Sequence, residues 1–169
     1  MGYPQESYYG AQVARRIEKI RLSAEGRRAF DFDCVDRNGK NISLSSIKGN
    51  FIILDFWASW GKPCRKSHPG LVQLYEKYHT KGLDIVSISS DKGNVHPWQR
   101  AIDEDNIGKW KLILAELCHT KDISYKYNVQ FIPVRIVLDH NGNIIKRIDT
   151  ASDEEFVTYI DGLFLSTQN

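Results

Sequence analysis

The strongest hydrophobic pattern in the chain is an apolar run over residues 51–56 that a single acid, Asp55, interrupts. A run that is apolar on both faces is typical of a central strand in a sheet with parallel strands. Similar runs further along the chain predict more strands and a closing hairpin. These further strands are predicted over residues 83–89, 110–114, 133–138 and 143–148.

Between the strands the apolar spacing changes to that of amphipathic helices. The predicted helices span residues 63–78 and 97–106, one or two turns lie within 121–127, and a last helix begins after Ser152. Ser152 with Glu155 three residues on is typical of a capping box, and Pro69 predicts a kink in the first of these helices. The residues expected to face inward are Leu71, Leu74, Tyr75 and Tyr78, then Trp98, Ala101 and Ile102, then Phe156, Ile160 and Leu163. Strands that alternate with helices, followed by a hairpin and a helix, predict an α/β fold with a mixed central sheet.

The first fifty residues add two elements. Residues 29–35 and 41–44 predict an N-terminal β-hairpin whose turn contains Asn38-Gly39. Before it, the spacing of Val13, Ile17 and Ile20 predicts a helix over residues 7–23. This helix is either a linker from an upstream domain or an element that packs on the domain itself. We therefore divide the chain into an N-terminal helical extension or linker, 1–25, and one domain, 26–169.

Composition limits the function. The 169 residues suffice for one domain with a full core, and 41% apolar with 26% charged residues is typical of a soluble globular protein. A net charge of +2 is too small to indicate nucleic-acid binding, and no apolar run is long enough for a membrane span. The first sixteen residues lack the pattern of a signal peptide.

Three cysteines, Cys34, Cys64 and Cys118, are widely spaced along the chain. They form no C-x-x-C and no spacing typical of zinc, so we expect neither a metal site nor a cofactor. Cys34 and Cys118 are interpreted as small buried apolar residues, because free cysteine is often buried. A disulfide between two of the three cysteines stays open as an alternative.

Cys64 lies on the first turn of the helix predicted over 63–78, directly after Pro63. Proline is accepted at this position because its missing N–H has no partner there, and the helix dipole favours a thiolate. An acid, Asp55, lies in the buried strand that leads into this helix. A buried acid next to a cysteine at a helix start indicates a redox or nucleophilic site.

The whole stretch 51–69, FIILDFWASWGKPCRKSHP, resembles the active-site motif D-F-W-A-x-W-C-x-P-C-R of thioredoxin-like proteins. It is most similar to the TlpA/ResA-like thiol–disulfide oxidoreductases, which overlap with the redoxin (AhpC/TSA) group. The preceding DFDCVDRNGKNISLS resembles the N-terminal hairpin of the redoxin group. The resemblance covers about residues 30–163 and implies a thioredoxin-like fold with an N-terminal β-hairpin and flanking helices. It departs at one position, because Gly61 stands where the family has its first, attacking cysteine.

A second motif, NVQFIP at residues 128–133, resembles the cis-proline loop of the same family. The resemblance implies that Pro133 is cis and faces the cysteine position, and that the backbone of Ile132 pairs with a bound peptide or thiol. Taken alone, the dipeptide would be an ordinary trans X-Pro at a strand start. With the residues around the motif, the resemblance implies a partner groove that includes Trp60, Lys62 and Ile132. Trp57 is expected to serve packing.

Dithiol exchange needs a thiolate that attacks and a second thiol that resolves the mixed disulfide. Gly61 can supply neither, and Cys64, in the place of the resolving cysteine, is expected to be poorly exposed, with a higher pKa than an attacking thiol. The resemblance gives Asp55 the role of proton acceptor near Cys64. A Cys64–His68 pair and a Cys64–Cys118 redox pair are further options, against a packing role for His68.

Three functional hypotheses follow. The first is a thiol–disulfide oxidoreductase family member in cell redox homeostasis whose dithiol exchange is impaired or absent. The second is a redox-silent thioredoxin-fold binding module, and the third is a peroxidase that uses Cys64. The pattern P-x-x-x-T/S-x-x-C of peroxidases is not met, because Trp57 and Gly61 occupy its first two places. Expected partners are protein thiols or disulfides, or a peptide segment in the groove. The resemblance implies the cell envelope or periplasm, with the cytoplasm as the alternative.

Overall fold

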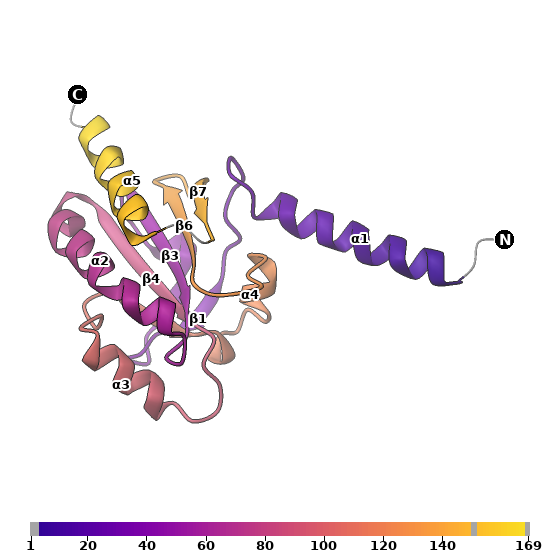
Figure 1. Ribbon diagram of the computed structural model, residues 1–169, viewed down its shortest axis with the longest axis horizontal. Coiled ribbons are helices and arrows are strands. Elements are labelled where there is room, and N and C mark those ends of the chain that lie inside the picture. Colours follow the sequence, from indigo (N-terminus) through magenta and orange to yellow (C-terminus); the bar gives the residue numbers. More distant parts are fainter. Residues whose placement is uncertain (1–3, 150–151, 168–169) are drawn as a thin grey trace.

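The computed structural model describes residues 4–149 and 152–167 of the chain, so residues 1–3 of the predicted extension lie outside it. A mixed five-stranded sheet forms its centre, in the order β5-β4-β3-β6-β7 (Figure 1). Strands β3, β4 and β5 are parallel, whereas β6 and β7 are antiparallel to their neighbours. The strands span Phe51–Trp57 (β3), Leu83–Ser89 (β4), Lys111–Leu114 (β5), Val134–Asp139 (β6) and Ile144–Ile148 (β7). The predicted α/β fold with a mixed sheet is confirmed.

Helices cover one face of the sheet, and a two-stranded hairpin with a short helix covers the other (Figure 1). The first group is α2 (Lys62–Tyr78), α3 (His96–Glu104) and α5 (Asp153–Ser166). The second group is β1 (Asp33–Val35), β2 (Asn41–Ser43) and α4 (Ile123–Lys126). All of these elements were predicted, with bounds that differ by a few residues.

Strand β3 separates the two halves of the core. All seven of its residues are buried, and successive side chains of a strand point to opposite faces. Ile53 and Trp57 therefore pack with the helices, whereas Leu54 and Phe56 pack with the hairpin. Because Asp55 has the same parity as Ile53 and Trp57, its carboxylate lies on the helix-covered face, beneath α2.

The structure differs from the prediction in two details, although Leu163 packs against the core as expected. In α5 the third fully buried residue is Phe164, whose ring stacks on Tyr78 with centroids 4.2 Å apart, while Leu163 is only partly buried. Strand β1 is shorter than predicted, because the backbone N–H of Ala29 bonds instead to the carbonyl of Gly142, at 2.8 Å. Ser152 caps α5 as predicted, and its hydroxyl accepts the N–H of Glu155.

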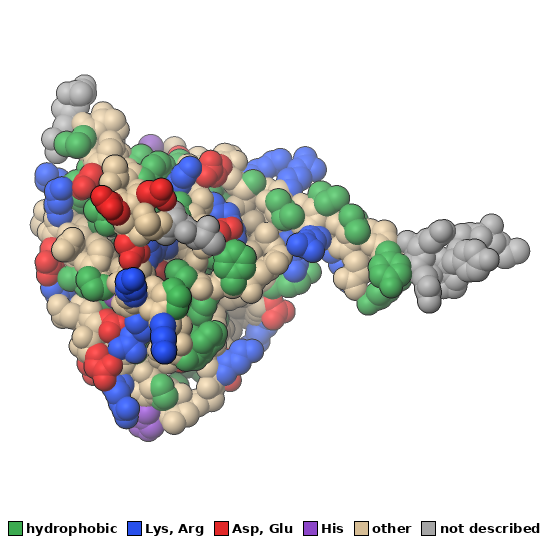
Figure 2. All heavy atoms as spheres, in the orientation of Figure 1, with side chains coloured by type: hydrophobic (Ala, Val, Ile, Leu, Met, Phe, Trp, Pro, Cys, Tyr) green, Lys and Arg blue, Asp and Glu red, His purple; other side chains and the backbone are tan. Residues whose placement is uncertain are grey.

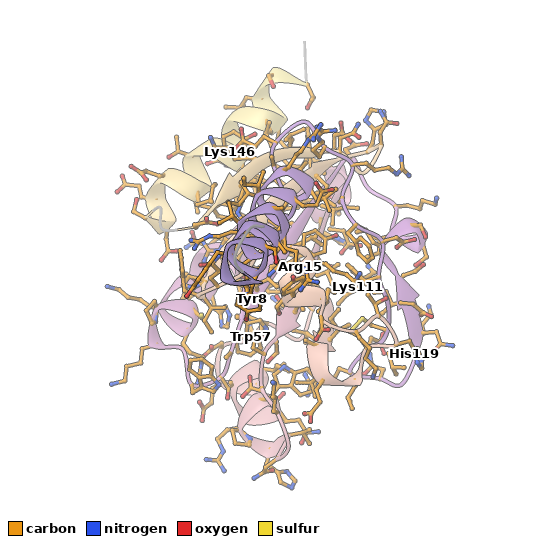
Figure 3. The ribbon with its side chains drawn as sticks, turned by 90° about the vertical axis from the view of Figure 1, so that its right-hand side faces the viewer. Tyr8, Arg15, Trp57, Lys111, His119 and Lys146 are labelled. Carbon is orange, nitrogen blue, oxygen red and sulfur yellow. A yellow bond between two sulfur atoms is a disulfide. The ribbon has the colours of Figure 1, made fainter. Side chains whose placement is uncertain are left out.

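Helix α1 (Pro4–Leu22) projects from the domain (Figure 1), and its hydrophobic side chains are visible on the projecting part (Figure 2). The predicted stripe of Val13, Ile17 and Ile20 is 57%, 58% and 50% exposed, so it packs on no other described part of this chain. The helix contacts the domain through Lys19, whose Nζ lies 2.8 Å from the ring centroid of Tyr125. Figure 3 looks toward the domain from the side of this helix. The division into a linker and a domain stays a prediction.

A disulfide joins Cys34 of β1 to Cys118, which follows the short 3-10 helix η3 (Ala115–Leu117). Both half-cystines are buried, with at most 1% of each exposed. The interpretation of two separate buried thiols is therefore wrong, and the disulfide that the sequence left open is present. Because Cys118 is bonded to Cys34, a Cys64–Cys118 redox pair does not form. Cys64 is the free cysteine.

Candidate active site

Cys64 lies on the first turn of α2, where Gly61 is the N-cap residue and Pro63 follows it into the helix. Its side chain is buried, with 1% exposed. The peptide bond between Ile132 and Pro133 is cis, the geometry that the resemblance implies. A Cβ on residue 61 would lie 3.4 Å from Cδ1 of Ile132. The helix start and the proline loop, seventy residues apart in the sequence, thus meet at one place.

The backbone of Gly61 lies directly beside the sulfur of Cys64, with no room for an unbonded Cβ between them. A Cβ atom on residue 61 would lie 2.8 Å from that Sγ and 3.3 Å from the carbonyl oxygen of Ala58. Unbonded side chains do not approach so closely, whereas the Cβ of a half-cystine stands roughly 3 Å from its partner's sulfur. The backbone here has the spacing of a cysteine pair, and one of the two side chains is missing.

Burial determines the protonation of Cys64. Removal of the thiol from water raises its pKa from 9.0 to about 11. A hydrogen bond with the backbone of Ala58 acts in the opposite direction, as does the charge of Arg135, while the charge of Asp55 raises the pKa further. The expected poor exposure and high pKa are confirmed, and Cys64 is a neutral thiol at neutral pH.

Asp55 is 1% exposed and lies in a polar network. The hydroxyl of Ser87 donates to its Oδ2 at 3.0 Å and in turn accepts the indole N–H of Trp110 at 2.9 Å. On the other side, Nε of Arg135 lies 3.7 Å from Oδ1. Ser87 and Arg135 are not among the predicted site residues, although a charged residue in an otherwise apolar strand is a usable signal.

His68 does not pair with Cys64. Its Nδ1 lies 2.6 Å from Oδ2 of Asp105, and its ring packs edge-on against Trp57, with centroids 4.8 Å apart. Arg65 also donates to Asp105, from Nη2 at 2.7 Å. Burial alone would raise the pKa of Asp105, but the hydrogen bonds from Arg65 and His68 outweigh it and the pKa is lowered. His68 therefore links α2 to the end of α3. This agrees with a packing role for His68 and not with a Cys64–His68 pair.

The loop before α2 is fixed by Asp91, which is itself 6% exposed. The backbone N–H of Ser59 donates to Oδ2 of Asp91 at 2.8 Å, and the hydroxyl of Ser89 donates to the same oxygen at 2.6 Å. The next residue, Trp60, is 68% exposed. These bonds position the loop that carries Gly61, and Asp91 is not among the predicted site residues.

A groove of about 470 Å³ runs beside the cis peptide bond. Its walls include Pro63 and Lys66 of α2, Phe131, Ile132 and Pro133 of the loop, and Arg135 of β6. Of the predicted groove residues, Ile132 lines it, whereas Trp60 and Lys62 do not. Among residues 4–149 and 152–167, no cluster of metal-ligating side chains exists. No helix in the same part of the chain is long and apolar enough to span a membrane.

The fold and the site define a thioredoxin-like protein. The model of the Redoxin family matches residues 24–161, and the chain belongs to this family. Among its relatives is a thiol-disulfide oxidoreductase ResA of Bacillus cereus, 32% identical over 131 residues, which are 78% of this chain and 71% of the relative. The thioredoxin-like protein YneN of Bacillus subtilis is 32% identical over 120 residues, 71% of this chain and 68% of the relative.

Solved structures agree with the fold. The thioredoxin domain of a thiol-disulfide oxidoreductase from Bacteroides vulgatus is 30% identical, with a TM-score of 0.67 over 79% of this chain and 98% of that domain. A thiol:disulfide interchange protein from Bacteroides sp. is 27% identical, with a TM-score of 0.70 over 82% of this chain and 89% of that structure. The chain is a Redoxin-family homologue of thiol–disulfide oxidoreductases.

Proposed function

We propose that this chain keeps the partner groove of its oxidoreductase relatives but does not carry out dithiol exchange. One observation supports the proposal above all: Gly61 lies beside the only free cysteine sulfur, that of Cys64. The other two cysteines are bonded to each other and buried. No second thiol in the chain is available to attack a disulfide or to resolve a mixed disulfide on Cys64.

The state of Cys64 supports the same conclusion. The thiolate is the nucleophile in disulfide exchange, and a pKa of about 11 leaves only a minute fraction of Cys64 ionised at neutral pH. With 1% of the residue exposed, a disulfide in solution has no direct access to the sulfur. The same two facts argue against a peroxidase, because a peroxidatic cysteine must be both ionised and reachable.

The groove favours a binding role. Its walls are apolar at Pro63, Phe131, Ile132 and Pro133, and an extended segment of another protein could lie along the loop. In this proposal Ile132 and Pro133 position the segment, and its source is a protein with a thiol, a disulfide or an extended peptide stretch. Asp55 would accept a proton from Cys64 only if a partner brought a disulfide to the sulfur, so that the Cys64 thiolate could attack one sulfur and release the other as the partner's thiolate.

Binding can be separated from thiol chemistry with an unfolded model peptide. We expect a fluorescent, reduced and alkylated insulin B chain to bind the wild type, and Cys64→Ser to bind it equally well in fluorescence anisotropy. Phe131→Ser, which removes a half-exposed groove wall, should weaken binding severalfold. Leu117→Ser is the matched control, because Leu117 is similarly exposed, at 57% against 53%, but lies outside the groove. Loss of binding in Cys64→Ser, or equal losses in Phe131→Ser and Leu117→Ser, would overturn the binding role.

We also propose an oxidising compartment, such as the cell envelope or periplasm, as the place of action. The disulfide between Cys34 and Cys118 supports this, because structural disulfides persist mainly in oxidising compartments. Fractionation of cells that produce the full-length protein, followed by thiol labelling, tests it. A reduced, cytoplasmic protein would contradict the proposal.

A further inference from the structure

Three neighbouring strands each place one polar side chain at the same level of the sheet. Asp55 of β3 lies opposite Ser87 of β4 and opposite Arg135 of β6 in the strand register. All three are buried, with 1%, 0% and 4% exposed. On the same face of these strands, apolar core residues lie on the side away from the helix start: Phe51 and Ile53 of β3, Leu83 and Ile85 of β4, and Val137 of β6. Towards the helix start, Trp57 is apolar, whereas Ser89 is a buried polar residue that donates to Asp91. The row is therefore a polar layer within the core, on the face that α2 and Cys64 cover.

Arg135 makes the row continuous with the surface. Its Nε lies 3.7 Å from Oδ1 of Asp55, and its Nη1 donates to Oδ1 of Asp153 at 3.2 Å. The Asp153 side chain is 42% exposed, on the first turn of α5. The guanidinium carbon also stands 4.7 Å from the ring centroid of Phe156. The side chain of Arg135 thus lies between Asp55 and Asp153, although its buried Nε and Nη2 have no hydrogen-bond partner among the described residues.

A buried carboxylate is costly unless an opposite charge or hydrogen bonds compensate it. Ser87 supplies one hydrogen bond to Asp55, and Arg135 supplies the opposite charge. Removal of Arg135 would leave the Asp55 carboxylate without an opposite charge directly beneath α2. Removal of Asp55 would leave Arg135 with Asp153 as its remaining acidic partner.

The same pair acts on the free thiol. The charges that bear on Cys64 are those of Asp55 from β3 and Arg135 from β6, and they act in opposite directions. On its own helix, Arg65 and His68 are held by Asp105 at the end of α3. The two charged residues of the polar row are thus the ones that set the electrostatic environment of the sulfur.

We propose that Arg135 is a positioning residue of this site, which holds the Asp55 carboxylate beneath Cys64 and supplies the positive charge that offsets it. Arg135 acts on the sulfur through space and through Asp55, and it takes no part in a bond-forming step. The proposal rests on the proposed function only in taking Cys64 as the free thiol of the site. It does not require that the groove binds a partner, so the two can fail separately.

The test is the titration of Cys64 itself, followed by carbon-13 NMR of its Cβ in protein labelled at cysteine. Cys34 and Cys118 serve as internal references, because half-cystines do not titrate. We expect Asp55→Asn to lower the titration midpoint and Arg135→Gln to raise it, each by about one pH unit. The double variant should return close to the wild type, and Arg135→Lys, which keeps the charge, should shift the midpoint less than Arg135→Gln. Lys40→Gln, a loss of an exposed surface charge, should leave it unchanged.

The direction in which the Cys64 midpoint shifts in Arg135→Gln distinguishes this role from a purely structural one. If Arg135 only supports packing, its loss loosens the site, admits water and lowers the midpoint toward the ordinary thiol value. A midpoint that falls in Arg135→Gln, or one that does not move in either single variant, would overturn the proposal. Should Arg135→Gln fail to fold, Asp55→Asn still tests the downward shift and Arg135→Lys, which keeps the charge, should stay closer to the wild type than Asp55→Asn does. An Arg135→Lys midpoint that falls as far as that of Asp55→Asn would overturn the proposal.

Discussion

A Cβ atom on residue 61 would lie 2.8 Å from the Sγ of Cys64. This distance is too short for two unbonded side chains and is close to that between a half-cystine Cβ and its partner's sulfur. At Gly61 and Cys64 the backbone therefore has the spacing of a cysteine pair, and residue 61 has no side chain. The proposed loss of dithiol exchange rests on this relationship.

The first prediction concerns the space beside the sulfur. Gly61→Ala adds a Cβ that must displace Cys64 or the loop, and overpacking of this kind costs about 1–3 kcal/mol of unfolding free energy. Urea unfolding measures the loss. The double variant Gly61→Ala/Cys64→Ala should lose less than the two single losses added together, because the contact with the sulfur is gone.

Gly162→Ala is the matched control for that change. Gly162 lies within α5, and a Cβ there would meet no atom within 4 Å. Alanine in place of glycine inside a helix stabilises by roughly 0.5–1 kcal/mol. If Gly61→Ala raised the free energy of unfolding as much as Gly162→Ala does, a Cβ on residue 61 could not lie as close to Cys64 as the structure indicates.

The second prediction follows from the thiol. The pKa of Cys64 is raised by burial from 9.0 to about 11, so the folded chain holds this proton more tightly than the unfolded chain. The neutral thiol therefore contributes stability that is fully present below pH 9 and lost as the pH rises toward 11. The stability difference between the wild type and Cys64→Ala should be constant below this window and fall by about 2 kcal/mol across it.

The difference between the two proteins is the quantity to measure, because tyrosines and lysines also titrate at alkaline pH. Urea unfolding at a series of pH values provides it. If the stability difference between the wild type and Cys64→Ala stays constant from pH 9 to about 11, Cys64 is solvated like a free thiol. Its raised pKa would then no longer explain a lack of reactivity.

The third prediction concerns the disulfide between Cys34 and Cys118, which are 84 residues apart in the sequence. A cross-link over so long a loop is expected to contribute about 2–5 kcal/mol. The denatured, unreduced chain should show one reactive thiol, and a reductant should lower the urea midpoint of the wild type. Cys34→Ser/Cys118→Ser should be less stable and indifferent to the reductant, whereas Cys64→Ser should keep the response. Three thiols in the unreduced chain would contradict the structure.

Most of the fold could be predicted from the sequence, because central strands are buried on both faces and their apolar runs have sharp ends. The strand over residues 83–89 was predicted with its observed bounds. The last helix shows the limit of such patterns. Apolar residues stand at both 163 and 164, and only the rotation of α5 against Tyr78 decides that Phe164 is the buried one.

The sequence predicts those residues of the site that lie within short local motifs. Gly61, Cys64, Asp55 and Pro133 come from two short stretches that meet in the structure. The pairing of Cys34 with Cys118 depends on how β1 packs against η3, and spacing along the chain does not determine it. Arg135 could be noticed as a charge in an apolar strand, but its partner Asp55 follows from the register of β3 and β6.

The central claim is that the absence of one side chain, at Gly61, removes dithiol exchange from an otherwise complete scaffold. The direct measurement is reduction of insulin by a dithiol reductant, followed by turbidity, with the wild type and Gly61→Cys compared at equal concentration. We predict that the wild type does not accelerate the reaction, that Gly61→Cys does, and that Gly61→Ser does not. Acceleration by the wild type that disappears in Cys64→Ser, or a folded Gly61→Cys without any gain, would contradict the account.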